Sequence, residues 1–273
     1  RANTTASNVT AIGKGAMYTN TTGHESVAIG SHALYNNTTG PTNVAIGHNA
    51  MFTNTTGGQN IGIGYSSLTA NTTGYDNAAV GYRSLFANTT GYNNAAFGRN
   101  ALMAATTGHN NTGIGFDSLR SFTTGNGRNT AVGAGSMYTT TTGYQNTAVG
   151  YNALRNNTTG YMNVALGESA GNGNTTGIEN AFIGFGAGVA NTTASNTFVG
   201  GYSGNVTTTG ASNTGCGHNT LRANTTGATN TAIGDNALDT NTTGSNNVAV
   251  GAHSLTSNTT AVDNVAVGVS ALA

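Results

Sequence analysis

The sequence predicts an all-β protein, a parallel β-solenoid of about sixteen coils, each formed by one seventeen-residue unit. The 273 residues of the chain consist almost entirely of this unit, close to N-T-T-G-x-x-N-x-A-x-G-x-x-A-L-x-x, which occurs sixteen times. Repetition at a short, fixed period is typical of solenoids, because a single unit cannot bury its apolar side chains without stacking on its neighbours. No linker interrupts the repeat, so we expect residues 1–273 to form a single solenoid domain.

The residue types within the unit favour strands and corners over helices. Counting from the Asn of N-T-T-G, Thr holds positions 2 and 3 and Gly holds position 11 in all sixteen units, and most units have a second Gly at position 4. So much Thr and Gly disfavours a helix, whereas residues 43–47 alternate as a strand does. We therefore expect two short strands per coil and coils about 4.8 Å apart. Both glycines are expected at corners that need positive φ or close backbone approach.

A change in side-chain volume indicates which positions share the interior of the coil. Leu or Met holds position 15 in thirteen units, but three consecutive units have Gly171, Gly188 and Gly204 there. Two of these units carry Phe182 and Phe198 at position 9, where nearly all others have Ala or Gly. Because interiors are close-packed, we expect the Phe rings to fill the lost volume. Positions 9 and 15 then point inward, and strand alternation turns positions 8 and 10 outward.

An apolar stripe is therefore expected on the outside of the coil. Position 10 is apolar in every unit, and position 8 is Val, Ile, Ala or Thr. A row of sixteen exposed apolar side chains exceeds what soluble monomers tolerate and marks an interface. We expect the stripe to pack against identical stripes of other copies, most simply around a threefold axis. Its position-10 residues include Ile12, Ile29, Ile46, Val80, Phe97, Leu166, Ile233 and Val267.

Charge and chemistry argue against several classes of function. Eight basic and eight acidic residues make up 6% of the chain, far below the roughly 25% of typical domains, which argues against nucleic acid and polybasic membrane partners. No apolar run is long enough for a membrane span. Carboxylates and histidines are scattered over outward positions, so we expect no catalysis, no metal and no cofactor. Cys216 stands where other units carry Ile or Val, and a small buried residue is predicted there.

Four further columns of the repeat, at positions 1, 2, 3 and 5, carry predictions. Tyr75, Tyr92, Tyr144 and Tyr161 share position 5, with His109 between the two pairs. Their rings are expected to stack into a strip that contacts a glycan or a neighbouring fibre, or else to serve as surface β-formers. Paired Thr columns resemble ice-binding β-solenoids, although strand alternation exposes at most one column. Twelve units match the N-glycosylation acceptor Asn-Thr-Thr, but glycans on coils about 4.8 Å apart would collide, which favours a turn or ladder role for Asn.

The segment N-x-A-x-G-x-x-A, as in residues 43–50, resembles the head repeats of YadA-like trimeric autotransporter adhesins. Similar arrays are found in bacterial surface fibres and phage tail-fibre proteins. The resemblance covers the whole chain, although the adhesin head unit is shorter than the unit repeated here. It implies a left-handed, trimeric β-roll that lies outside the cell or on a virion and serves attachment.

These features together predict an extracellular structural fibre or adhesin segment that is not an enzyme and whose main partner is itself. The expected assembly is a homotrimer or a head-to-tail filament, since the first and last residues fall at nearly the same phase of the unit. A host surface or glycan is a further expected partner, and the cell surface or a virion is the expected location. The alternatives are a phage tail-fibre shaft and an ice-binding β-solenoid.

Overall fold

The structure, a computed structural model that describes residues 3–273, is all-β, and the described residues divide into two compact units, the first ending at residue 142 and the second covering 143–273. The prediction of a head-to-tail filament used the position of residue 1 within the repeat unit, and residue 1 lies outside the described residues. Within each unit, every coil contributes one strand of three residues to a parallel sheet. The predicted fold class, a parallel β-solenoid with one repeat of the sequence in each coil, is confirmed. The organisation as a single domain stays a prediction.

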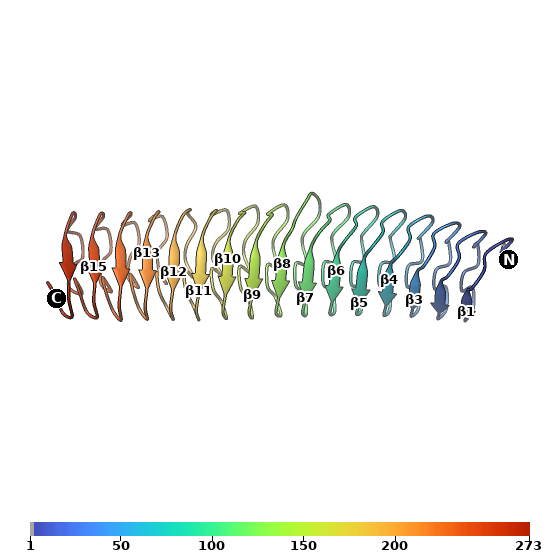
Figure 1. Cartoon of the computed structure of the whole chain (residues 1–273), viewed down its shortest axis with the longest axis horizontal. Coiled ribbons are helices and arrows are strands. Elements are labelled where there is room, and N and C mark those ends of the chain that lie inside the picture. The colour runs from blue at the N-terminus through green and yellow to red at the C-terminus, as the bar shows by residue number, and fades with distance from the viewer. Residues whose placement is uncertain (1–2) are drawn as a thin grey trace. The chain divides into compact units, whose positions relative to one another are not determined.

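The first unit stacks its strands in chain order, each parallel to and in register with the next (Figure 1). Equivalent positions of successive coils are therefore neighbours, as in the pair Ile12 and Ile29. The strands are β1 Thr10–Ile12, β2 Val27–Ile29, β3 Val44–Ile46, β4 Ile61–Ile63, β5 Ala78–Val80, β6 Ala95–Phe97, β7 Thr112–Ile114 and β8 Thr130–Val132.

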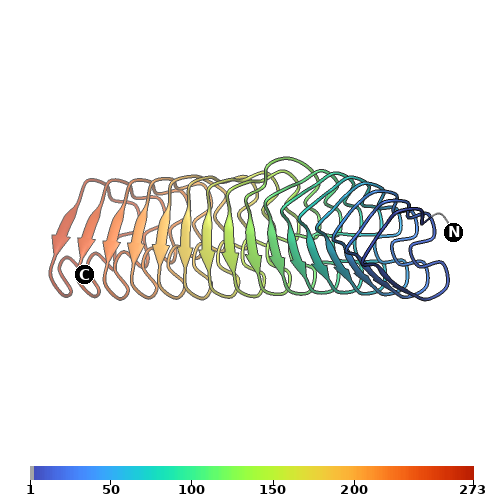
Figure 2. The ribbon, with the colours of Figure 1, turned by 45° about the vertical axis from the view of Figure 1, so that its right-hand side comes forward.

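The second unit repeats this arrangement with the same parallel register (Figure 2). Its strands cover positions 8 to 10 of each coil, as those of the first unit do. They are β9 Thr147–Val149, β10 Val164–Leu166, β11 Ala181–Ile183, β12 Thr197–Val199, β13 Thr214–Cys216, β14 Thr231–Ile233, β15 Val248–Val250 and β16 Val265–Val267.

The prediction of two strands per coil is wrong, because a turn with alternating backbone handedness replaces the second strand. In the coil of β2, His32 at position 13 and Leu34 at position 15 have φ of 59° and 50°, whereas a strand requires negative φ. The turn still bonds to both neighbouring coils. The His32 N–H donates to the Lys14 carbonyl of the preceding coil at 2.8 Å, and the Leu34 N–H donates to the Ala50 carbonyl of the following coil at 3.0 Å.

The two glycine columns have the roles predicted for them, each for a different reason. Gly47 at position 11 has φ of 133°, and a Cβ there would lie 2.5 Å from the Gly64 carbonyl oxygen. Gly40 at position 4 lies outside the left-handed region, but its Cβ would overlap the Gly57 carbonyl oxygen of the next coil. Glycine thus permits positive φ at one corner and close approach of the backbones at both.

Asparagine side chains form hydrogen-bonded ladders in the interior. At position 7, the Asn60 amide donates to Asn43 Oδ1 at 3.3 Å and to the Gly74 carbonyl at 2.8 Å. At position 1, the Asn54 amide donates to Asn37 Oδ1 at 2.9 Å. These side chains are fully buried, and the ladders satisfy polar atoms that would otherwise be costly to bury. The ladder role predicted for the Asn of Asn-Thr-Thr is confirmed.

Two coils differ in length, and the corner before the strand absorbs both differences. The coil of β8 has one extra residue near Gly127 and Arg128, and the coil of β12 lacks one near Ala194. The strand register is unchanged at both places, since Thr112 pairs with Thr130 and Ala181 pairs with Thr197. The outward order of positions along the strands is therefore preserved within each unit.

Candidate functional site

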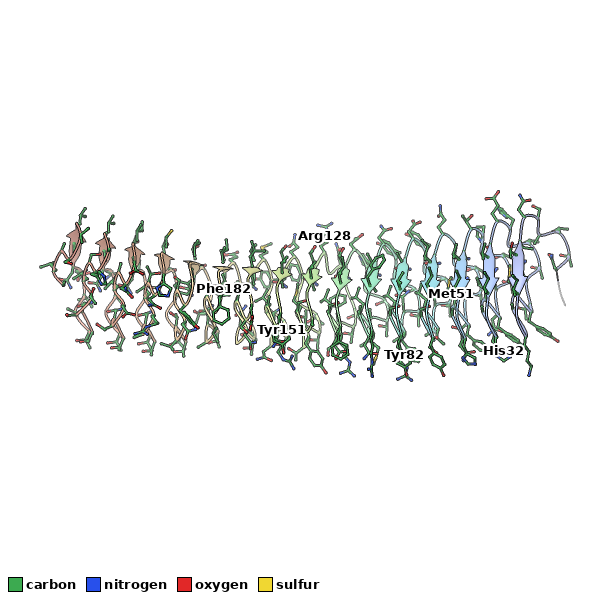
Figure 3. All side chains as sticks on the ribbon, turned by 90° about the horizontal axis from the view of Figure 1, so that it is seen from below. His32, Met51, Tyr82, Arg128, Tyr151 and Phe182 are labelled. Carbon is green, nitrogen blue, oxygen red and sulfur yellow. The ribbon has the colours of Figure 1, made fainter. Side chains whose placement is uncertain are left out.

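The interior of the second unit confirms the inference on which the outward surfaces depend. Phe182 and Phe198 are fully buried, and Figure 3 shows Phe182 inside the coil. A Cβ on Gly171 or Gly188 would overlap the Phe182 ring, and a Cβ on Gly204 would overlap the Phe198 ring. Positions 9 and 15 therefore share the interior. The first unit shows the same pairing, because a Cβ on Gly62 at position 9 would lie 2.8 Å from Met51 Cγ at position 15.

In the first unit, the side chains at positions 8 and 10 face outward. We call the column of position-10 residues the apolar stripe. Ile12 and Phe97 are exposed, and Ile29, Ile46 and Val80 are half-buried. Phe97 keeps 40% of its surface in contact with solvent. The predicted orientation of these residues is confirmed, and their contact with another copy stays a prediction.

The second unit carries the stripe through Leu166, Ile233 and Val267, which are all exposed. The strand register places Cys216 directly beside Ile233 on this stripe. The prediction that Cys216 is a buried core residue is wrong, because its side chain is exposed. Position 10 is apolar in every coil although its side chains point away from the interior. The apolar residues beside Cys216 in this column therefore do not imply that Cys216 is buried.

The position-5 tyrosines stack as predicted. The rings of Tyr75 and Tyr92 are parallel with centroids 5.0 Å apart, and His109 continues that stack at 4.5 Å. In the second unit, Tyr144 and Tyr161 stack at 4.7 Å. Since each ring covers the face of the next, these strips offer mainly ring edges and hydroxyl groups to a ligand. Their role in ligand binding or lateral contact stays a prediction.

The paired Thr columns divide into a bonded column and a solvent-facing column. Thr38 at position 2 donates its hydroxyl to the Thr55 carbonyl of the next coil at 3.0 Å, whereas Thr39 and Thr56 at position 3 are exposed. At most one exposed column was predicted for an extended stretch; these residues form a bend and not a strand, and one column is exposed. Ice binding itself stays a prediction, which a measurement of thermal hysteresis decides.

A second aromatic surface lies on the turn that follows the position-11 glycine, where the side chains at positions 12, 13 and 16 point outward. We call this surface the turn face. Figure 3 shows Tyr82 and His32 on it, and Arg128 on another side of the coil. Among the described residues of the first unit, it carries four cations and one carboxylate among many aromatic rings. The sequence places charged residues and tyrosines at these positions, but their types vary from coil to coil, so the repeat does not indicate which side chains come into contact.

The titratable groups of the described residues are dispersed over the surface. No cluster of three or more His, Cys, Asp or Glu side chains suited to a metal ion occurs within residues 3–273. The ion pairs described are Arg120 with Asp117, His218 with Asp235, and Arg222 with Asp239. Over the same residues, no helix has the length and apolar character needed to cross a membrane.

Comparison with known proteins does not assign a family to this chain. No family model matches the sequence, and no curated protein matches it significantly.

Proposed function

We propose that this chain is a segment of an extracellular structural fibre or adhesin that associates with further copies of itself through the apolar stripe. The observation that carries the proposal is the outward orientation of an unbroken apolar column in each unit. Phe97 and Ile233, at 40% and 42% exposure, belong to this column. Contiguous apolar surface of this kind is characteristic of interaction sites.

The parallel register makes the stripe suited to association between identical copies. Successive position-10 side chains are neighbours, as with Ile183 beside Leu166 and Val199 beside Ile183. Because the coils have the same spacing in every copy, each coil of one copy can contact the equivalent coil of another. A closed arrangement around a symmetry axis would bury all stripes at once, and the resemblance to trimeric adhesin heads favours a threefold axis. A head-to-tail filament is the alternative assembly.

The surface chemistry supports a structural or attachment role over catalysis. Carboxylates such as Glu25, Asp76 and Glu168 are exposed and lie on separate coils, so they lack the close partners that acid–base chemistry requires. By analogy with surface fibres, the cell surface or a virion is the proposed location. A phage tail-fibre shaft would use the same stripe in the same way.

A charge placed on the stripe tests the proposal. We expect Ile233→Glu to raise the protein concentration needed for half-assembly by at least about tenfold, equivalent to about 1.4 kcal/mol, because identical carboxylates would meet at the interface. The matched control is Thr226→Glu, which adds the same charge at an exposed position of the same coil. Sedimentation velocity measures assembly, and circular dichroism checks that both variants keep their strands. A wild-type chain that stays monomeric at all concentrations would contradict the proposal.

A further inference from the structure

The turn face of the first unit contains a continuous stack of rings and a cation that runs across five coils. His48, Tyr65 and Tyr82 at position 12 stack with centroid distances of 5.2 and 5.5 Å. Arg99 continues the column, with its guanidinium carbon 5.6 Å from the centre of Tyr82 and 5.8 Å from that of Phe116. Cation–π contacts of this kind hold a guanidinium group in place without neutralising its charge.

A second cation lies beside this stack. The guanidinium carbon of Arg83 is 5.7 Å from the centre of Tyr82 and 4.8 Å from that of Phe86. Two arginines therefore flank one tyrosine ring. Arg83 Nε is shielded from solvent and has no hydrogen-bond partner in the part of the chain described, and a shielded N–H donor of this kind is costly to leave unpaired.

Neither arginine is neutralised by a carboxylate within residues 3–273. Asp117, a carboxylate on the turn face of this unit, has other partners: its Oδ1 lies 3.7 Å from Arg120 Nε and accepts a hydrogen bond from the Asn100 amide at 2.9 Å. Arg83 and Arg99 thus present two fixed, unpaired cations among phenol hydroxyls and amides. This combination matches a ligand that has separated anionic groups and many hydroxyl groups.

We propose that the turn face around Arg83 and Arg99 binds a linear acidic glycan. The two guanidinium groups would each pair with a carboxylate or sulfate group, for which their planar N–H donors are suited. The hydroxyls of Tyr65 and Tyr82 and the Asn100 amide would bond to sugar hydroxyls between the charges. This inference names a ligand for the proposed attachment role. It rests on the proposed function in one respect only, namely that the protein lies outside the cell, where it can meet such a glycan.

The geometry favours a glycan over single-stranded nucleic acid. Proteins that bind single strands stack bases on the faces of aromatic side chains, but the ring faces of Tyr65 and Tyr82 are already covered by their neighbours in the column. The cations are also too few for the phosphate density of nucleic acid. A glycan needs only ring edges, hydroxyl groups and widely spaced charges.

On the same face of the second unit, two basic side chains lie beside carboxylates. There, His218 Nδ1 lies 3.2 Å from Asp235 Oδ1, and Arg222 Nε lies 2.9 Å from Asp239 Oδ1. Both carboxylates belong to the coil that follows their partner. The proposed site is therefore assigned to the first unit.

Binding of defined polysaccharides to the whole chain tests this inference. The probes are polygalacturonate, which carries carboxylates, heparin, which carries sulfates, neutral dextran, and an oligothymidylate single strand. We expect the wild type to bind at least one acidic glycan more tightly than dextran and the oligonucleotide, with affinity that falls as salt rises. The preferred acidic probe distinguishes a carboxylate from a sulfate ligand. Equal binding of dextran, or tighter binding of the oligonucleotide, would overturn the inference.

Variants locate the binding on the turn face. We expect Arg83→Gln with Arg99→Gln to weaken binding of the acidic glycan at least about tenfold, and the corresponding Lys pair to recover part of it, since Lys keeps the charge but loses the planar donors. The control for each single replacement is Arg128→Gln, which also removes one positive charge but lies on another side of the coil; Arg83 and Arg128 have similar φ of 53° and 45°. An equal loss in the Arg128 variant would contradict the site.

Sedimentation of the same samples separates this inference from the proposed function. Assembly without binding of any acidic glycan would refute the glycan site and leave self-association standing. Glycan binding by a chain that stays monomeric would refute self-association and leave the glycan site standing.

Discussion

Replacing Phe198 with Ala is expected to lower the free energy of unfolding by about 3–5 kcal/mol, because it leaves a cavity in an interior only one coil wide. The ring is fully buried and lies against Gly204 of its own coil. Restoring volume from the opposite side should repair much of this loss. Leu221 holds position 15 of the next coil with φ of 51°, close to the 58° of Gly204, so the backbone at Gly204 already suits a Leu.

The test is a double-mutant cycle measured by urea unfolding. Gly204→Leu alone is expected to destabilise the chain, because the new side chain would collide with the Phe198 ring. The double variant Phe198→Ala with Gly204→Leu should lose less free energy of unfolding than the two single variants lose together, by at least about 1 kcal/mol. Additive effects would mean that positions 9 and 15 do not share the interior, and the outward orientation of the apolar stripe would lose its main argument.

Replacing Gly200 with Ala is expected to lower the free energy of unfolding by at least about 3 kcal/mol, the upper end of what positive φ alone costs a residue with a side chain. Gly200 has φ of 129°, and a Cβ there would overlap the Gly217 carbonyl of the next coil. Relieving the overlap would also separate two coils at the point where the Gly217 N–H donates to the Val199 carbonyl at 2.8 Å. The strain and the lost bond act in the same direction.

The neighbouring residue provides the control. Gly201 lies outside the left-handed region, and a Cβ there would meet only His218 Cδ2 at 3.4 Å. Gly201→Ala is therefore expected to change the free energy of unfolding by no more than about 1 kcal/mol, with stabilisation as the favoured direction. Comparable urea midpoints for the two variants would show that the corner does not need glycine.

The sequence was sufficient to predict the features that depend on repetition. The seventeen-residue period predicts that the coils stack. The small residue at Gly204 and the large one at Phe198 in the same repeat indicate which side of the strand is buried. The second strand was predicted wrongly because Leu, as at Leu34, rarely adopts positive φ, and neither propensity nor hydrophobic period signals that conformation. Bonds between coils stabilise it instead, as between Leu34 and Ala50.

The turn face could not be predicted from the same patterns. Tyr82 and Arg99 hold the same position in successive repeats and become neighbours only because the coils stack in register. The sequence places the charged residues at outward positions, but it does not indicate that Arg83 and Arg99 flank the same tyrosine ring. Cys216 stands at position 10, the column predicted to face outward, so its exposure agrees with the apolar stripe and contradicts the burial predicted from its residue type alone.

The single cysteine gives the most direct test of self-association through the apolar stripe. Cys216 is exposed in the isolated chain and lies beside Ile233, so its rate of alkylation by a maleimide reports whether the stripe is covered. We predict that alkylation slows at least about tenfold as the protein concentration rises through the assembly range, and that Ile233→Glu restores the fast rate. Alkylation that stays equally fast while sedimentation shows an assembled particle would contradict the account, because the copies would then meet through another surface.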